Sequence, residues 1–164
     1  MKSARRGFQP IGREQLLQEF DHDSYRAVRK LREPTCCPDC GAVFQNGRWT
    51  WGSAPAGAHP DRCPACHRIH DKFPAGFLTL SGAFLGEHRD EILHLMRNHE
   101  AKEKAEHPLQ RIMAIVASAD GVTVTTTDAH LARDLAQALH HAYKGELEFH
   151  YNKEENLLRA TWSR

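Results

Sequence analysis

The clearest hydrophobic periodicity begins after Pro74, where the pattern turns helical. Between residues 86 and 108, apolar positions recur three and four residues apart, with charged residues elsewhere. The predicted face comprises Ile92, Leu95, Met96 and His99. This spacing is typical of a helix packed on one side, and Pro108 closes it. Residues 100–106 offer only alanine as an apolar residue, so we expect that half of the helix to be solvated.

Two hairpins around a second helix are predicted in the rest of the chain. The first joins two β-rich runs of residues 111–127 through Asp120-Gly121, a pair favoured in tight turns. The second joins residues 146–151 to residues 157–164. Between them, Asp128 caps a helix whose buried positions are predicted to be Leu131, Leu135, Leu139 and Ala142. We therefore expect residues 77–164 to form a helix–strand–strand–helix–strand–strand domain of the α+β class.

Residues 36–76 differ in composition, because they contain all five cysteines of the chain. Asn46-Gly47 interrupts a weakly alternating run, which predicts a hairpin between two cysteine pairs. A loop over residues 52–61 then leads to the second pair. This segment is predicted to be a small separate lobe.

Residues 1–35 are predicted to be a basic helical arm. Leu16, Leu17 and Phe20 have helical spacing, a second short helix is expected to run from Asp23 or Ser24 to Leu31, and Pro34 ends it. The arm has eight Lys and Arg against five Asp and Glu, a net charge of +3. Residues 77–164 have ten against thirteen, a net charge of −3. This asymmetry indicates either a contact surface near the arm or simple solvation of a small protein.

Composition narrows the class of protein. At 164 residues, the chain is long enough for one core, and Gly and Pro are at ordinary levels. No apolar run approaches the ~20 residues of a membrane span, and no secretory signal is visible at the start. We therefore expect a cytoplasmic protein without a membrane partner. In a reducing compartment, five cysteines favour metal or redox chemistry over disulfides.

The cysteines form two CxxC pairs. They are Cys37 with Cys40 and Cys63 with Cys66, separated by 22 residues. Each CxxC turn points two sulfurs at one place, and Gly41 allows the first turn to be tight. Four sulfurs brought together in this way suit Zn²⁺ in tetrahedral geometry, so we predict a structural zinc site in a zinc ribbon. Four thiolates leave no open position for water, so no catalytic residue and no enzyme activity are expected.

The cysteine pairs also fit other interpretations. Cys63, Cys66 and His67 also match the attachment motif of c-type haem, which normally requires export. A thioredoxin-like dithiol would lie between a strand and a helix, whereas proline-rich loops are expected around both pairs. Iron fits four thiolates as well as zinc does. Cys36 is interpreted as a spare thiol, although an exchange with Cys37 stays open.

Several histidines are also candidates. His59, His67 and His70 lie near the cysteines in the sequence and are open alternatives as ligands or as groups that orient one. A separate set of His130, Asp134 and His141 shares one helix and resembles an acid–base or metal cluster. No nucleophile accompanies this set, so a hydrolase is the least favoured interpretation.

The ribbon also carries residues suited to RNA. Trp49 and Trp51 alternate with Arg48, and aromatic and arginine side chains on a ribbon stack on bases and bind phosphates. The two tryptophans are expected to share one face, so both would be core residues or both would bind. The full set of predicted RNA-binding residues is Arg26, Arg29, Lys30, Arg48, Trp49, Trp51, Arg62 and Arg68.

Parts of the chain resemble the archaeal and eukaryotic family of large-ribosomal-subunit export adaptors. The resemblance covers residues 36–70 and 110–162. It rests on the paired CxxC turns and on Gly121, Thr126, Thr127, Asp128, His130, Leu131, Ala132, Arg133, Tyr143, Lys144 and Gly145. Members of that family bind ribosomal RNA and protein through zinc turns and an α/β domain. Because this chain has two CxxC pairs where the family has more, it resembles a short bacterial-type relative.

Together these features predict a non-enzymatic zinc-binding protein that binds RNA, with a ribosomal subunit as the expected partner. The alternative is an adaptor or regulator that binds a protein partner through its α+β domain. The two interpretations differ in their dependence on salt, because phosphate contacts weaken steeply as salt is added.

Overall fold

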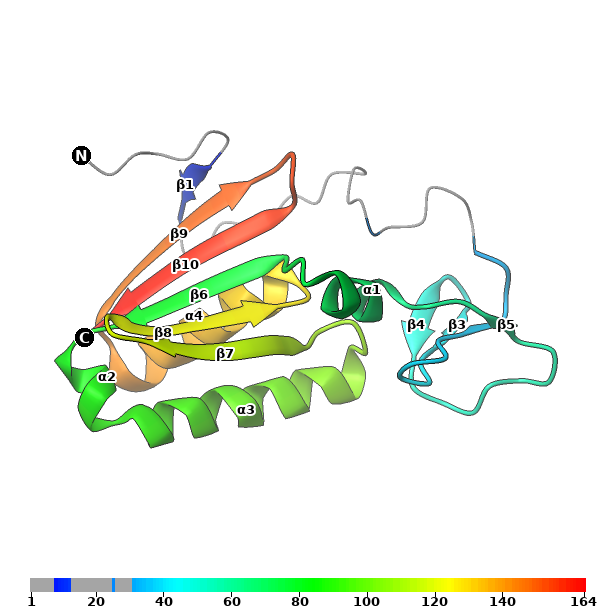
Figure 1. Cartoon of the computed structure of the whole chain (residues 1–164), viewed down its shortest axis with the longest axis horizontal. Coiled ribbons are helices and arrows are strands. Elements are labelled where there is room, and N and C mark those ends of the chain that lie inside the picture. Colours follow the sequence, from blue (N-terminus) through cyan, green and yellow to red (C-terminus); the bar gives the residue numbers. More distant parts are fainter. Residues whose placement is uncertain (1–7, 13–24, 26–30) are drawn as a thin grey trace.

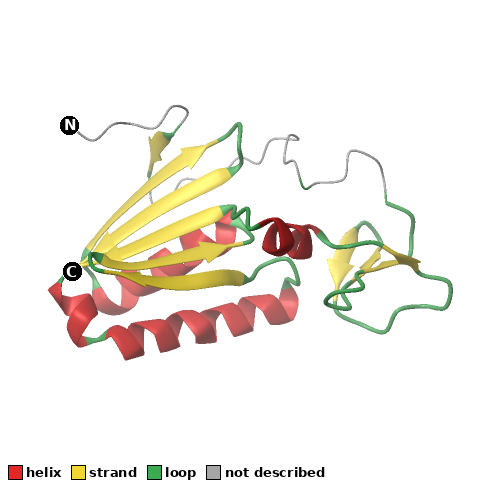
Figure 2. Cartoon of the chain, viewed as in Figure 1, coloured by secondary structure: helices red, strands yellow, loops and turns green. Residues whose placement is uncertain are grey.

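The computed structural model of the chain describes residues 8–12, 25 and 31–164. Over these residues the protein has a mixed α+β fold with four helices and two β-sheets (Figures 1 and 2). The helices predicted around Leu16, Leu17 and Phe20 lie outside the described residues, as does the predicted helix start at Asp23 or Ser24. In the described part, no helix combines the length and the apolar character that crossing a membrane requires.

The larger sheet has six strands in the order β1-β9-β10-β6-β8-β7. These strands are β1 (Gln9–Ile11), β6 (Gly76–Ser81), β7 (Ile112–Ser118), β8 (Gly121–Thr126), β9 (Glu146–Asn152) and β10 (Leu157–Ser163). β10 lies parallel to β6, whereas the other neighbouring strands are antiparallel. Short β1 adds an edge strand from the segment that was predicted to be a helical arm.

The prediction that the chain turns helical directly after Pro74 is wrong, because β6 lies there, inside the sheet. Leu78 and Leu80 are fully buried, whereas Thr79 between them is exposed. This alternation is the signal of a strand, but it spans only six residues before α2 (Ala83–Glu87) begins. The α+β domain therefore begins with a strand that the predicted element order lacked.

Helices cover one face of this sheet. α4 (Ala129–Tyr143) packs against the sheet, and α3 (Arg89–Glu106) lies along α4, as Figure 1 shows. The predicted cap is confirmed, because Asp128 accepts a hydrogen bond from the Leu131 amide at 3.1 Å. The buried stripe of α4 comprises Leu131, Ala132, Leu135, Ala136 and Leu139. Ala142, which was predicted to be buried, is exposed because this stripe ends one turn earlier.

Both predicted hairpins of the α+β domain are present. In the β7–β8 hairpin, Ser118 pairs with Gly121, so the turn residues are Ala119 and Asp120 rather than Asp120 and Gly121. Gly121 instead allows a close approach between strands. With φ at 149°, an added Cβ would lie 1.9 Å from the main-chain oxygen of Leu80 in β6.

The smaller sheet forms the ribbon. Its strands are β2 (Thr35–Cys36), β3 (Val43–Gln45), β4 (Arg48–Thr50) and β5 (His59–Pro60), in the order β4-β3-β2-β5. The predicted hairpin is confirmed, with Asn46 at φ 55° and Gly47 at φ 80° between β3 and β4. Both turn amides donate to the carboxylate of Glu33. In Figure 1, α1 (Pro64–Asp71) lies between this ribbon and the larger sheet.

Candidate metal centre

The four cysteines of the two CxxC pairs converge on one point. The Sγ atoms of Cys37, Cys40, Cys63 and Cys66 all lie within 4.8 Å of one another. Cys37 directly follows β2, and a tight turn brings Cys40 back toward it. In this turn the Gly41 amide donates to the Cys37 oxygen at 2.9 Å, with Gly41 at φ 81°. The positive φ explains why glycine suits the position behind the second sulfur.

The second pair lies at the start of a helix. Cys63 is the N-cap of α1, its Sγ accepts a hydrogen bond from the Cys66 amide at 3.4 Å, and Pro64 occupies the first turn. The prediction that proline-rich loops surround both pairs is therefore wrong for this pair. A helix start is also where a reactive dithiol would lie. Convergence with Cys37 and Cys40 nevertheless favours a four-sulfur site over a separate dithiol.

The site is buried and rich in donors to sulfur. Cys37, Cys63 and Cys66 are 1%, 0% and 7% exposed. Burial raises the pKa of Cys37, but amides of Cys63, Cys40 and Asp39 outweigh it and lower that pKa to about 7. Burial raises the pKa of Cys63 and of Cys66 above their ordinary value. A bound cation would offset this burial and favour the thiolate form of the sulfurs.

A single arginine from the α+β domain contacts the sulfurs. Arg111 donates from one guanidinium nitrogen to Cys66 Sγ at 3.2 Å, and from the other to Cys40 at 3.2 Å and Cys63 at 3.5 Å. Arg111 belongs to the loop between α3 and β7 and is 8% exposed. Burial opposes its charge, yet the hydrogen bond to Cys66 and the cysteine charges raise the pKa of Arg111.

The neighbouring candidate ligands stay apart from the cluster. A metal ion can be held where the ligand atoms of several His, Cys, Asp or Glu side chains lie close together. Among the described residues, the group that meets this condition consists of the four cysteines. Cys36 is half-buried, and its Sγ faces the Cys37 oxygen at 3.8 Å. His59, His67 and His70 are not members of the group. Four sulfurs form a complete tetrahedral set, which zinc and iron both accept.

The two ribbon tryptophans have different roles, so the expectation that they act as a pair is wrong. Trp49 packs against the cysteine cluster and lies 5.5 Å from the Phe44 ring. Trp51 instead donates from its indole Nε1 to the Lys104 oxygen at 2.7 Å, and the Arg111 guanidinium lies 5.9 Å from its ring. Both indoles are therefore engaged within the protein, although Trp51 is 38% exposed.

The predicted basic contacts also separate. Arg48 is exposed at the start of β4. Arg62 forms an ion pair with Asp39, which connects the two CxxC turns. Arg68 is 3% exposed and donates to the Phe73 oxygen at 3.1 Å, so its burial argues against a phosphate contact. The remaining three predicted contacts, Arg26, Arg29 and Lys30, lie outside the described residues.

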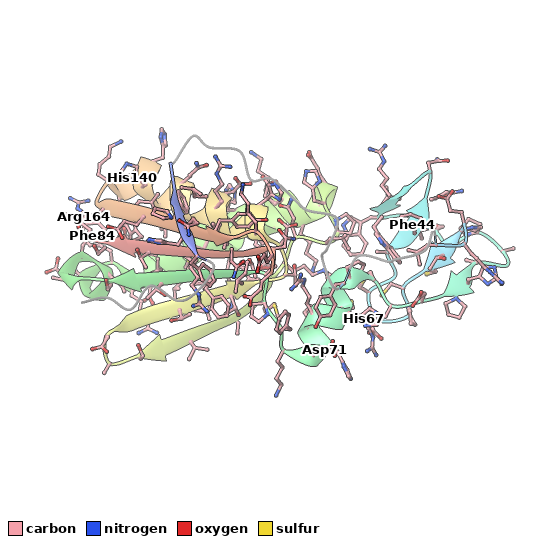
Figure 3. The ribbon with its side chains drawn as sticks, turned by 90° about the horizontal axis from the view of Figure 1, so that it is seen from above. Phe44, His67, Asp71, Phe84, His140 and Arg164 are labelled. Carbon is pink, nitrogen blue, oxygen red and sulfur yellow. The ribbon has the colours of Figure 1, made fainter. Side chains whose placement is uncertain are left out.

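Figure 3 shows the two ends of the molecule. Phe44 of β3 lies toward one end and Phe84 and Arg164 lie at the opposite end, with His67 and Asp71 of α1 between them. Asp71 accepts a hydrogen bond from the Tyr25 hydroxyl at 3.0 Å. Tyr25 therefore contacts the last residue of α1.

The histidine set on α4 has a different geometry from the one its spacing indicated. The Nδ1 atom of His130 lies 3.5 Å from a carboxylate oxygen of Asp128, the helix cap. His141 is exposed near the end of α4. Burial and the charge of Glu103 on α3 raise the pKa of Asp134. Asp134 thus interacts electrostatically with α3, and the three residues do not form a metal-ligand group.

Neither Arg111 nor the role of Thr127 beside it was predicted from the sequence. The hydroxyl of Thr127 accepts from the Arg111 amide at 2.9 Å and donates to the Leu109 oxygen at 2.6 Å. It thereby holds the loop from which Arg111 reaches the sulfurs. No local pattern marks an arginine 45 residues from its cysteine partner. The preceding Pro108 marks only the end of a helix.

Comparison with known proteins adds no relative. The chain matches no family model, and neither a curated protein nor a solved structure gives a significant match. The resemblance to the export adaptors therefore stays a prediction. The metal centre is the feature on which a functional argument can be based.

Proposed function

We propose that the protein is a non-enzymatic zinc-binding protein that binds RNA on a ribosomal particle, in the cytoplasm. The four converging cysteines, three of which are buried, support the metal-binding half of this proposal. Zinc is the ion that a closed tetrahedral set of four cysteines most often holds in structural sites. Such a site stabilises a lobe too small to have a large hydrophobic core, and it leaves no coordination position for a reactant.

The distribution of charge on the ribbon lobe carries the RNA-binding half. The carboxylates of Glu33, Asp39 and Asp71 have partners within the protein, at the hairpin amides, Arg62 and Tyr25. By contrast, exposed cationic side chains are available at Arg32, Arg48 and Lys72, and Asp61 is the further exposed acid of the lobe. Hydrogen bonds from amides and a hydroxyl leave the charges of Glu33 and Asp71 in place, so the exposed cations Arg32, Arg48 and Lys72 are what favour contact with an anion such as an RNA phosphate.

Binding to purified ribosomal subunits and to ribosomal RNA, measured across a salt series, tests this function. We expect affinity to fall steeply with salt, and Arg32→Ala with Arg48→Ala to weaken binding and reduce the salt slope by about one per lost contact. Arg97→Ala, an exposed substitution on α3 far from the ribbon, is the matched control. A flat salt response, or equal loss in the control, contradicts RNA binding.

A protein adaptor is the second candidate, because the larger sheet has a face that the described helices leave open. Thr79 of β6 and Thr161 of β10 are paired neighbours, and both are exposed there. Val116 of β7 is 57% exposed. If Thr161→Arg abolishes co-sedimentation with ribosomal subunits while the Arg32 and Arg48 substitutions leave it unchanged, the adaptor function is supported instead.

A further inference from the structure

Arg111 is fixed by its own domain before it reaches the cysteines. Its Nε donates to the Pro108 oxygen at 2.8 Å, and its amide donates to the hydroxyl of Thr127, at the end of β8. The nearby Leu109 side chain packs against the cysteine cluster. The main chain and Nε of Arg111 are therefore held by the α+β domain, while its two terminal guanidinium nitrogens contact the cysteines.

The guanidinium of Arg111 spans both CxxC turns. It donates to Cys40 of the first turn and to Cys63 and Cys66 of the second. A planar guanidinium presents its donors in a fixed fork, so one side chain contacts sulfurs from two turns only when those turns are already together. The Arg62–Asp39 ion pair and the β2–β5 pairing already join the two turns, and a metal ion bonded to all four sulfurs would hold them more firmly.

The contact between Arg111 and the cysteine sulfurs is also favoured by charge. Four thiolates around a divalent cation carry a net charge of −2, which is costly to bury without a compensating cation. Arg111 supplies one positive charge at three of the four sulfurs and is itself buried. Each partner thus offsets the desolvation of the other, and neither is well accommodated alone.

We propose that Arg111 completes the metal centre and couples metal binding by the ribbon to docking of the α+β domain. This inference rests on the proposed metal binding and extends it. Such coupling is reciprocal, so docking raises metal affinity by the same factor by which the metal favours docking. The metal then stabilises the ribbon itself and also fixes the position of the ribbon relative to the larger sheet.

Trp51 reports whether the ribbon is docked against the α+β domain, and Trp162 is the internal reference. The Trp51 indole donates across the interface to the Lys104 oxygen in α3. The Trp162 indole donates at 2.7 Å to the Lys144 oxygen, within the α+β domain. In a nitrogen-15 NMR spectrum each indole N–H gives one peak, and Trp51→Phe identifies the reporter peak. Loss of docking moves the Trp51 peak toward the position of a solvated indole and leaves the Trp162 peak in place.

The deciding experiment compares the whole wild-type chain with Arg111→Gln, Arg111→Lys and the exposed control Arg97→Gln, all saturated with Zn²⁺. We expect Arg111→Gln to bind one Zn²⁺ at least about tenfold more weakly in chelator competition, as for other groups that hydrogen-bond to metal ligands. Its Trp51 peak is expected at the solvated position although zinc is bound. Arg111→Lys is expected to fall between, because it keeps the charge without the fork.

Several outcomes overturn the coupling. One is an Arg111→Gln variant with wild-type zinc affinity, and another is one with the Trp51 peak in its wild-type position. If Arg111→Gln does not fold, the test uses Arg111→Lys and wild-type protein measured with and without chelator. A Trp51 peak that keeps its wild-type position both in Arg111→Lys and in chelator-treated wild-type protein overturns the coupling. Wild-type protein that binds no Zn²⁺ overturns the proposed metal binding as well, which separates the two failures.

Discussion

The indole Nε1 of Trp51 donates a hydrogen bond to the main-chain oxygen of Lys104 at 2.7 Å, which joins the ribbon to the last turn of α3. The acceptor lies at a helix end, where carbonyl groups lack partners within the helix. The same indole lies beside Arg111. One side chain therefore contributes both to the interface and to the surroundings of the metal centre.

Replacing Trp51 with Phe keeps an aromatic ring but removes the donor. We expect the protein to lose about 1 kcal/mol of stability, the net value of one such hydrogen bond. Denaturant unfolding of the zinc-loaded protein measures the change. The Lys104→Ala substitution is the control, because it leaves the accepting main-chain oxygen in place, and a loss of similar size there argues against this contact as the cause.

Replacing one cysteine of the centre is expected to abolish metal binding. Cys63→Ser removes a fully buried sulfur at the N-cap of α1, and we expect the purified variant to hold no stoichiometric zinc and to unfold at a lower temperature. Cys36→Ser is the matched control, since Cys36 lies beside the cluster without belonging to it. Metal analysis and thermal unfolding measure both effects. Equal zinc loss in the control would make Cys36 a ligand.

Gly121 is expected to tolerate no side chain. An alanine there would place its Cβ 1.9 Å from the Leu80 oxygen, so β6 and β8 would have to separate. We expect Gly121→Ala to destabilise the fold by at least about 2 kcal/mol.

Gly86 gives the comparison for this substitution. It lies in α2 with open space around the position of a Cβ. Gly86→Ala is expected to be neutral or to stabilise the protein by roughly 0.5–1 kcal/mol. Chemical denaturation of both variants measures the difference, and similar values for the two glycines would contradict the close approach of β6 and β8.

Asp134 is expected to reduce stability at neutral pH. Burial and the charge of Glu103 raise its pKa in the folded protein, so its ionised form is less favourable there than in the unfolded chain. Its destabilising effect is complete above the folded pKa and disappears as the pH falls below the ordinary carboxyl pKa of about 4. Asp134→Asn should therefore raise the melting temperature at pH 7 and have progressively less effect toward pH 4.

The exposed carboxylate Glu87 on α2 is the control for this pH dependence. Glu87→Gln is expected to leave the melting temperature within error at every pH. Because acid also weakens metal binding in all these proteins, the quantity to compare is each variant's difference from wild type at the same pH. A difference for Asp134→Asn that grows on acidification would contradict the electrostatic account.

Several features of the fold were predicted from local patterns alone. The hairpin at Asn46-Gly47 depends on the positive φ of two adjacent residues, and the cap at Asp128 depends on one side chain and an amide three residues later. The four cysteines were predicted from their spacing to be metal ligands, and their sulfurs converge. For the hairpin, the cap and each CxxC turn the cause lies within a few residues, so the sequence contains the whole signal.

Tertiary structure alone decided the rest. The place of β6 inside the sheet depends on pairing with β8 and β10, which lie far along the chain. The different roles of Trp49 and Trp51 depend on where α3 ends in space. Arg111 meets its sulfurs across 45 residues or more. Contacts of this kind arise only when separate elements pack together, and no local pattern of residue types records which partner each side chain will meet.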